Sequence, residues 1–305
     1  TFSLVLSLPF SLYGTFVIEE KFGFNKTNLS TYALDTVKSL ILSALIGIPL
    51  LLGILYFFEY AGSMAWLYVW VLVIVVSLVM QVIAPIWIMP IFNKFTRLEE
   101  GELKQSIMEY AERVGFTYDN VYVIDGSRRS AHSNAFFTGF GKTKRIVLFD
   151  TLIEQLNKDE IVSVIAHEVG HNKKGHILLG TALGMVHTGA LLFLLSLVLE
   201  NRLLFDAFFM ENTSVYASIM FFGLLFTPVD LLMSPLMQLV SRKHEYQADH
   251  WAVETTANRQ HLVSGLKKLA AKNLANLSPH PIFVILNYSH PPLSNRIEAI
   301  NVAKT

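Results

Sequence analysis

The chain has 305 residues, of which 52% are hydrophobic and only 16% are charged, and its mean hydropathy is +0.45. This composition excludes an ordinary water-soluble domain and indicates a membrane protein. The formal net charge is zero and cysteine is absent. Neither a nucleic-acid partner nor disulfides or thiolate chemistry are therefore expected, and any metal must be held by histidine and carboxylate side chains.

Five apolar segments have about the length that a helix needs to cross a bilayer, roughly 20 residues. The predicted spans are residues 2–18, 39–58, 63–88, 177–199 and 215–240. The first is short, and the sequence begins with Thr1 rather than Met, so we expect that it starts inside a longer chain. The spans divide the chain into membrane helices at 1–92 and 177–240 and polar sections at 93–176 and 241–305.

The two polar sections lie on the same side of the membrane, because two spans separate them. Among the 24 Lys and Arg residues, only Arg202 lies on the opposite side. The positive-inside rule therefore predicts that both polar sections face the cytoplasm. The membrane is then the bacterial cytoplasmic membrane or, in a eukaryote, that of the endoplasmic reticulum.

The first polar section combines strand and helix patterns. Three β-rich segments, 121–125, 134–140 and 144–150, are separated by turns that contain glycine, and they predict a small antiparallel sheet. The stretch LNKDEIVSVIAHEVGHNKKGH then has the pattern of a helix, with Asn157 as its N-cap.

The HEVGH segment of this helix has the spacing of a zinc-peptidase motif. His167 and His171 are four residues apart, so they project from one helical face and can bind one zinc ion. Glu168 then lies beside the bound water as a general base. The pattern also arises by chance, so a third ligand is needed to support it.

His176 is the first candidate for the third ligand, because metzincins extend the motif to HExxHxxGxxH. Gly175 and His176 do not fit that spacing, and a position nine residues after His167 points to the opposite helix face. Glu245 in SRKHEYQAD is the better candidate, since two His and a downstream Glu form a known catalytic zinc site. Asp249, one turn later, can accept the second N–H of a ligating histidine. A solvated, salt-bridged surface is the alternative for both carboxylates.

Seven segments, in order, resemble the type I CAAX prenyl endopeptidases, membrane zinc proteases of gluzincin type that cleave the C-terminal tripeptide from prenylated proteins. They are FVIEEKFGFNK (16–26), FNKFTRLEEGELK (92–104), VIDGSRRSAHSNAFFTGF (123–140), KRIVLFDTLIEQL (144–156), AHEVGHNKKGH (166–176), SRKHEYQAD (241–249) and YSHPPLSNRIEAI (288–300). The resemblance covers nearly the whole chain. It implies an α-helical multi-spanning membrane protein in which a ring, or barrel, of transmembrane helices surrounds a large chamber, together with a zinc-peptidase domain.

The resemblance also implies roles for individual residues. His167, His171 and Glu245 match the ligands of one Zn²⁺ ion, and Glu168 matches the general base.

Three residues outside the zinc motif are assigned in the same way. Asn134 matches the residue that holds the substrate backbone along the sheet edge, although a turn residue is an alternative. His290 matches the residue that stabilises the oxyanion, while its bare sequence context is that of a helix boundary. Arg296, in the same motif, is expected to bind and orient the substrate.

The implied partners are the lipid bilayer and a peptide or protein with a C-terminal CAAX-like sequence, with or without a prenyl group. Two other interpretations are a membrane heat-shock metallopeptidase that removes damaged membrane proteins, and a non-catalytic membrane scaffold or transport component. The FVIEEKFGFNK and SHPP segments favour the CAAX peptidase, and an intact Glu168 argues against the scaffold.

Overall fold

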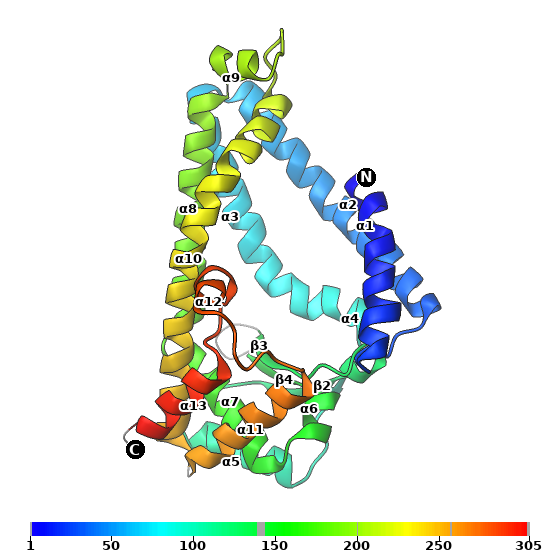
Figure 1. The fold of residues 1–305 in the computed structure, drawn as a ribbon, viewed down its shortest axis with the longest axis vertical. Helices are drawn as coiled ribbons and strands as arrows, with labels where there is room; N and C mark the ends of the chain where they lie inside the picture. The colour runs from blue at the N-terminus through cyan, green and yellow to red at the C-terminus, as the bar shows by residue number, and fades with distance from the viewer. Residues whose placement is uncertain (1, 139–143, 200, 257, 304–305) are drawn as a thin grey trace.

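The computed structural model describes residues 2–138, 144–199, 201–256 and 258–303, and the described chain has a membrane-helix part and a smaller α/β part (Figure 1). The long helices are α1 (Phe2–Tyr13), α2 (Leu29–Tyr60), α3 (Ala65–Ile83), α8 (His176–Val198) and α10 (Val215–Thr255). A short helix, α9 (Arg202–Ala207), lies near the turn between α8 and α10, at the end far from the α/β part.

Four of the five predicted spans are confirmed among the described residues as helices long and apolar enough to cross a membrane. They are Leu29–Tyr60, Gly62–Phe92, His176–Val198 and Val215–Thr255. The predicted span at 2–18 forms α1 and a π-helical continuation, η1 (Gly14–Glu19), and is not among these four. The span Gly62–Phe92 continues from α3 through a π-helical turn, η3 (Ala84–Ile88), into α4 (Met89–Phe92).

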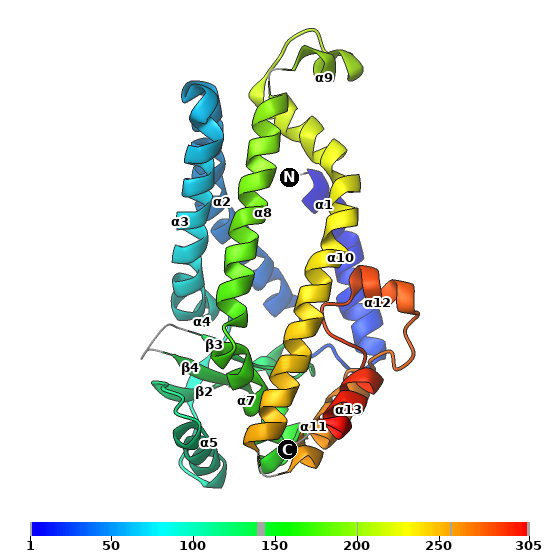
Figure 2. The same cartoon turned by 90° about the vertical axis from the view of Figure 1, so that its left-hand side faces the viewer.

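The long helices form an open ring rather than a packed bundle. In Figure 1, α2 meets α8 and α10 at the end far from the α/β part and diverges from them toward α1, which stands apart from both, and in Figure 2 α3 and α10 lie on opposite sides of α8. Burial agrees with this arrangement, because the share of buried residues in the most apolar stretch of each candidate span is 0% in Leu29–Tyr60, 0% in Gly62–Phe92, 6% in His176–Val198 and 17% in Val215–Thr255. A helix inside a packed bundle would bury one full face, so the ring predicted from the resemblance is confirmed.

The sheet of the α/β part is mixed, so the prediction of an antiparallel sheet was wrong in one pairing. Its strands are β1 (Phe95–Arg97), β2 (Asn120–Ile124), β3 (Ala135–Thr138) and β4 (Arg145–Phe149), in the order β1-β2-β4-β3. The pair β2–β4 is parallel and the other two pairs are antiparallel. The connection 125–134 is not a tight hairpin: it contains a short 3₁₀ turn and a bridge to the loop before α2, and it carries the chain past the position of β4. Residues 139 and 140 of the predicted second strand lie outside the described residues.

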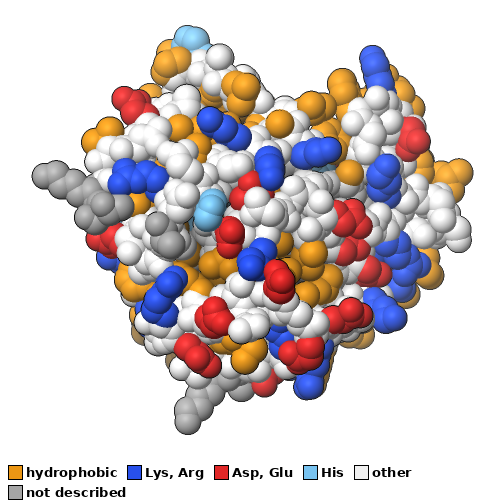
Figure 3. Space-filling view, turned by 90° about the horizontal axis from the view of Figure 1, so that it is seen from below, with side chains coloured by type: hydrophobic (Ala, Val, Ile, Leu, Met, Phe, Trp, Pro, Cys, Tyr) orange, Lys and Arg blue, Asp and Glu red, His pale blue; other side chains and the backbone are white. Residues whose placement is uncertain are grey.

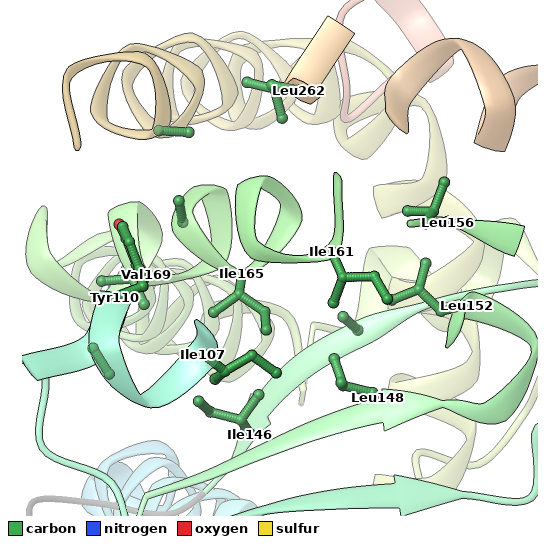
Figure 4. Packing of buried hydrophobic residues seen from close by; sticks show 14 of the residues in the cluster. Ile107, Tyr110, Ile146, Leu148, Leu152, Leu156, Ile161, Ile165, Val169 and Leu262 are labelled. Atoms are coloured by element: carbon green, nitrogen blue, oxygen red, sulfur yellow. The ribbon is translucent and has the colours of Figure 1, made fainter. Parts of the chain in front are cut away.

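Helix α7 (Lys158–Lys173) is the centre of the α/β core. Asn157 and Glu160 form a capping box at its start, as the sequence predicted for the N-cap. Figure 4 shows α7 between the sheet, which contributes Ile146 and Leu148, and α11 (Arg259–Lys272), which contributes Leu262. The helix that contains the zinc-peptidase motif is therefore held in a densely packed apolar core.

Helix α12 (Pro281–Asn287) packs against α10 and has no buried residue. Three other helices supply buried side chains to the core: α5 (Glu102–Arg113), α6 (Asp150–Gln155) and α13 (Leu293–Val302). Side chains of both charge signs are spread over the end of the molecule that these elements form (Figure 3). Helix α10 continues through residues 240 and 241, where a domain boundary was predicted, so one continuous helix joins the membrane part to the α/β part.

Candidate active site

The two histidines of HEVGH lie side by side on α7. Their Nε2 atoms are 3.2 Å apart, because residues four apart lie one above the other on a helix. His167 is buried, and His171 is half-buried at the edge of a cavity.

Glu245 completes the cluster from α10. Its Oε2 lies 3.4 Å from His167 Nε2, and its Oε1 lies 3.2 Å from His171 Nε2. One ligand atom from each of the three residues lies within 4.8 Å of the others. The structure thus brings together the three residues that the sequence analysis selected as metal ligands.

Gly170 allows α7 and α10 to approach closely enough for this arrangement. A Cβ atom at this position would lie 3.0 Å from Trp251 Cβ, 3.1 Å from Ala248 Cα and 3.2 Å from the Ala248 carbonyl oxygen. Two of these three neighbours are backbone atoms of α10, which cannot move away by a change of side-chain rotamer. The glycine of HEVGH therefore has a packing role that is separate from the metal ligands.

Asp249 and Arg296 orient His167. The Nδ1–H of His167 donates to Asp249 Oδ1 at 2.8 Å, which directs its Nε2 toward Glu245. Arg296, on α13, donates to both oxygens of Asp249 at 2.7 and 2.8 Å. This bidentate pair fixes the carboxylate, and Arg296 Nη1 also lies 3.5 Å from Glu245 Oε2. Arg296 is thus largely buried in a network of acidic groups.

The chemistry of the cluster fits a bound cation. Glu245 Oε2 is buried and has no hydrogen-bond partner among the described residues. A buried carboxylate oxygen without a partner is costly unless it binds a cation. Two imidazoles and one carboxylate are the ligand set of several catalytic zinc sites, in which a fourth position stays open for water.

Glu168 and His290 lie next to this cluster. Glu168 follows His167 on α7, and burial raises the pKa of Glu168 above its usual value, although His167 and His171 act in the opposite direction. His290 Nε2 lies 3.4 Å from Glu245 Oε1, and its side chain is 64% exposed. Both residues line the same two cavities, so a substrate that enters either cavity meets both of them.

The two cavities meet at the cluster. The larger, about 480 Å³, extends along α8 and α10 of the membrane part, and its apolar lining includes Phe137, Leu183 and Met237. The smaller, about 170 Å³, extends toward α11, and Asn134 lines it. An extended chain can therefore pass the cluster with hollows on both sides.

Asn134 immediately precedes β3, one of the two edge strands of the sheet. Its side-chain oxygen accepts a hydrogen bond from the Ala135 backbone N–H at 2.8 Å, and its own carbonyl accepts from Phe149 N–H at 3.1 Å. Among the described strands, β3 pairs with β4 alone, so its other edge is available to an added strand.

His176 lies closer to the cluster than the sequence pattern indicated. Its Nδ1 is 3.1 Å from His171 Nδ1, although it is not one of the three clustered ligands. Gly175 has a left-handed conformation (φ 71°) and separates α7 from α8, so the helical phase counted from His167 no longer applies at His176. The glycine itself was the signal that could have revealed this, because it marks a helix end.

This arrangement of two histidines and a glutamate, at the junction of membrane helices and a sheet edge, defines a membrane metallopeptidase. Residues 97–304 match peptidase family M48, and residues 1–94 match a family described as CAAX prenyl protease N-terminal, five membrane helices. The chain belongs to peptidase family M48. This membership confirms the resemblance predicted from the sequence and does not support a non-catalytic scaffold.

Individual relatives agree over almost the entire chain. The sequence is 41% identical to CAAX prenyl protease 1 of Saccharomyces cerevisiae over 98% of this chain and 69% of that protein. It is 35% identical to the human CAAX prenyl protease 1 homolog over 99% of this chain and 72% of that protein. The crystal structure of S. mikatae Ste24p matches with a TM-score of 0.93 and 40% identity, over 98% of this chain and 73% of that one.

Proposed function

We propose that the protein is a zinc endopeptidase that removes the C-terminal tripeptide from prenylated CAAX-type proteins. The observation that carries this proposal is the cluster of His167, His171 and Glu245, with Glu168 beside it, in a cavity that extends along the membrane helices. The relatives named CAAX prenyl protease 1 support the substrate class.

His167, His171 and Glu245 would hold one zinc ion. When bound there, zinc polarises the scissile carbonyl and makes water a stronger acid, with a pKa of about 7. The Glu245 oxygen that has no hydrogen-bond partner supports this assignment, since a bound cation would offset the cost of its burial.

The protein's own residues supply the proton transfers and the substrate alignment. Glu168 takes a proton from the attacking water and gives it to the leaving amine, and its raised pKa brings it closer to the working pH of a general base. His290, which lines both cavities, donates a hydrogen bond to the oxyanion. Asp249 and Arg296 keep His167 in the orientation that the metal requires.

The substrate peptide binds as an added strand along the free edge of β3, with Asn134 at the start of that edge. Main-chain hydrogen bonds then orient the peptide past Glu168. The apolar lining of the larger cavity suits an apolar substrate group, and this cavity lies against helices that cross the membrane. A prenyl chain in the bilayer can therefore stay in an apolar environment while the peptide reaches the site.

The catalytic side faces the cytoplasm, because nearly all Lys and Arg residues lie on that side. In a eukaryotic cell the membrane is that of the endoplasmic reticulum, and in a bacterium it is the cytoplasmic membrane. Accessibility of a single cysteine introduced into α5, tested in sealed vesicles with an impermeant reagent, checks this orientation; labelling only from the luminal or outer side would contradict it.

The proposed activity is tested with a matched pair of CAAX peptides, one farnesylated and one not, analysed by mass spectrometry. The purified protein should cleave the farnesylated peptide after the modified cysteine and cleave the bare peptide much more slowly. Glu168→Gln should retain zinc and lose activity by a factor of about 100 or more, whereas Glu109→Gln, an exposed change on α5, should behave as wild type. Equal cleavage of both peptides would contradict the substrate class and favour the quality-control interpretation. Full activity of Glu168→Gln would contradict the mechanism.

A further inference from the structure

His176 is held by contacts on three sides. It is the first residue of α8, only 6% of it is exposed, and its Nδ1 lies 3.1 Å from His171 Nδ1. Its Nε2 lies 2.8 Å from Gln247 Oε1, on α10. Its ring stacks on that of His244, with centroids 4.0 Å apart and an angle of 7° between the planes. These contacts leave the imidazole little freedom to rotate.

The hydrogen bonds set the position of the protons. The carboxamide oxygen of Gln247 can only accept, so Nε2 of His176 carries the proton and Nδ1 is the acceptor. The proton between the two Nδ1 atoms therefore belongs to His171. In that tautomer the Nε2 lone pair of His171 faces Glu245, which is the form that can bind a metal.

The reverse arrangement is not compatible with a metal. If the amide of Gln247 donated, His176 would place its proton on Nδ1 and donate it to His171. The proton of neutral His171 would then sit on Nε2, where the cation has to bind. A single amide orientation on α10 thus decides whether His171 is a ligand.

We propose that His176 and Gln247 form a hydrogen-bond relay that fixes His171 in its metal-binding tautomer. The relay is the counterpart of the contact by which Asp249 orients His167 on the other side of the cluster. His176 is a positioning residue and does not touch the metal. This inference rests on the proposed zinc site, because it assigns a function to the nitrogen of His171 that faces away from that site.

Two substitutions of His176 separate the relay from simple packing. His176→Phe keeps a ring of similar size that can stack on His244 but removes the acceptor. His176→Asn removes the ring but keeps a side-chain oxygen on Cγ, where Nδ1 stood. The relay predicts that His176→Phe lowers zinc affinity about 10- to 100-fold and that His176→Asn stays much closer to wild type. A packing role predicts the opposite order.

The test measures zinc affinity of the purified full chain by competition with a chromophoric chelator, and it measures thermal unfolding in the same samples. The control is His250→Phe, which makes the same change on α10 at a half-exposed histidine that pairs with Glu254. Gln247→Met and Gln247→Glu form a second pair, in which only the glutamate keeps an acceptor for His176.

The outcomes distinguish the relay from the site itself. Weaker zinc binding by His176→Phe and Gln247→Met, with His176→Asn, Gln247→Glu and His250→Phe near wild type, supports the relay. Wild-type zinc affinity in His176→Phe would overturn it, and so would equal losses in His176→Phe and His176→Asn. If the His176 variants do not fold, the Gln247 pair decides by the same comparison. A wild-type chain that binds no zinc would contradict the proposed zinc site as well.

Discussion

Replacement of Gly170 by alanine tests whether helix contact sets the geometry of the metal ligands. The added Cβ would meet α10 at 3.0 to 3.2 Å from Trp251 Cβ and from backbone atoms of Ala248. Carbon atoms in good contact are about 3.5–4.0 Å apart, so α7 and α10 must separate by about 0.5 Å. Glu245 lies on α10, less than one turn before Ala248, and therefore moves with it.

The size of the effect follows from this displacement. Overpacking costs about 1–3 kcal/mol, and removal of a helical glycine offsets about 0.5–1 kcal/mol of that. A net loss of about 0–2.5 kcal/mol in the free energy of unfolding is expected. The effect on the metal is larger in proportion, because ligand distances tolerate only about 0.2 Å. Zinc affinity should fall at least about tenfold, chiefly through the loss of Glu245 as a ligand.

The assay compares zinc affinity and thermal unfolding of Gly170→Ala with those of Gly184→Ala. Gly184 lies within α8, and a Cβ there would have open space around it. Gly184→Ala should therefore leave zinc affinity unchanged and keep or slightly raise the unfolding temperature. If Gly170→Ala binds zinc as tightly as wild type, the idea that close helix contact positions Glu245 is refuted.

Two further predictions concern His167 and Arg296 in the site, and a third concerns Glu160 at the start of α7. Burial lowers the pKa of His167, but its hydrogen bonds with Asp249 and Glu245 outweigh this effect and raise the pKa to about 9. Zinc must therefore displace a proton from His167, so zinc affinity should rise about tenfold per pH unit until the pH is about 9. A zinc affinity that does not change between pH 6 and 8 would contradict this. Arg296→Lys loses the bidentate contact with Asp249 and should weaken zinc binding about tenfold, as measured by chelator competition; unchanged affinity would show that one contact suffices. Burial raises the pKa of Glu160, but hydrogen bonds that include one from Lys268 outweigh this effect and lower the pKa. The contribution of the ionised Glu160 to stability is therefore present above a pH of about 4.5 and is lost as the pH falls. Glu160→Gln should lower the free energy of unfolding by about 1–3 kcal/mol at pH 7 and by less in acid, and an equal loss at both pH values would be inconsistent with an ionised Glu160.

The parts of the site that could be predicted from the sequence depend on local periodicity. His167 and His171 share a face because they are one helical turn apart, and the same rule places Asp249 one turn after Glu245. The capping residue Asn157 and four of the apolar spans could also be predicted, because capping and the length of an apolar segment are properties of short stretches of sequence.

The parts that the sequence could not indicate depend on how distant segments meet. The parallel pairing of β2 and β4 requires the connection 125–134 to pass around a strand that comes later in the chain. The position of His176 is an intermediate case: Gly175 marks a helix end in the sequence, but the direction in which α8 then starts follows from tertiary packing. The contact between Gly170 and Ala248 joins α7 to α10, and no local pattern marks a glycine that is needed for such an approach.

The most direct test of the proposed centre is anomalous scattering at the zinc absorption edge from crystals of the full chain. The account predicts one zinc peak, between Nε2 of His167, Nε2 of His171 and the carboxylate of Glu245. A zinc peak that is bound elsewhere, or the absence of a peak at these three residues in zinc-loaded crystals, would contradict it.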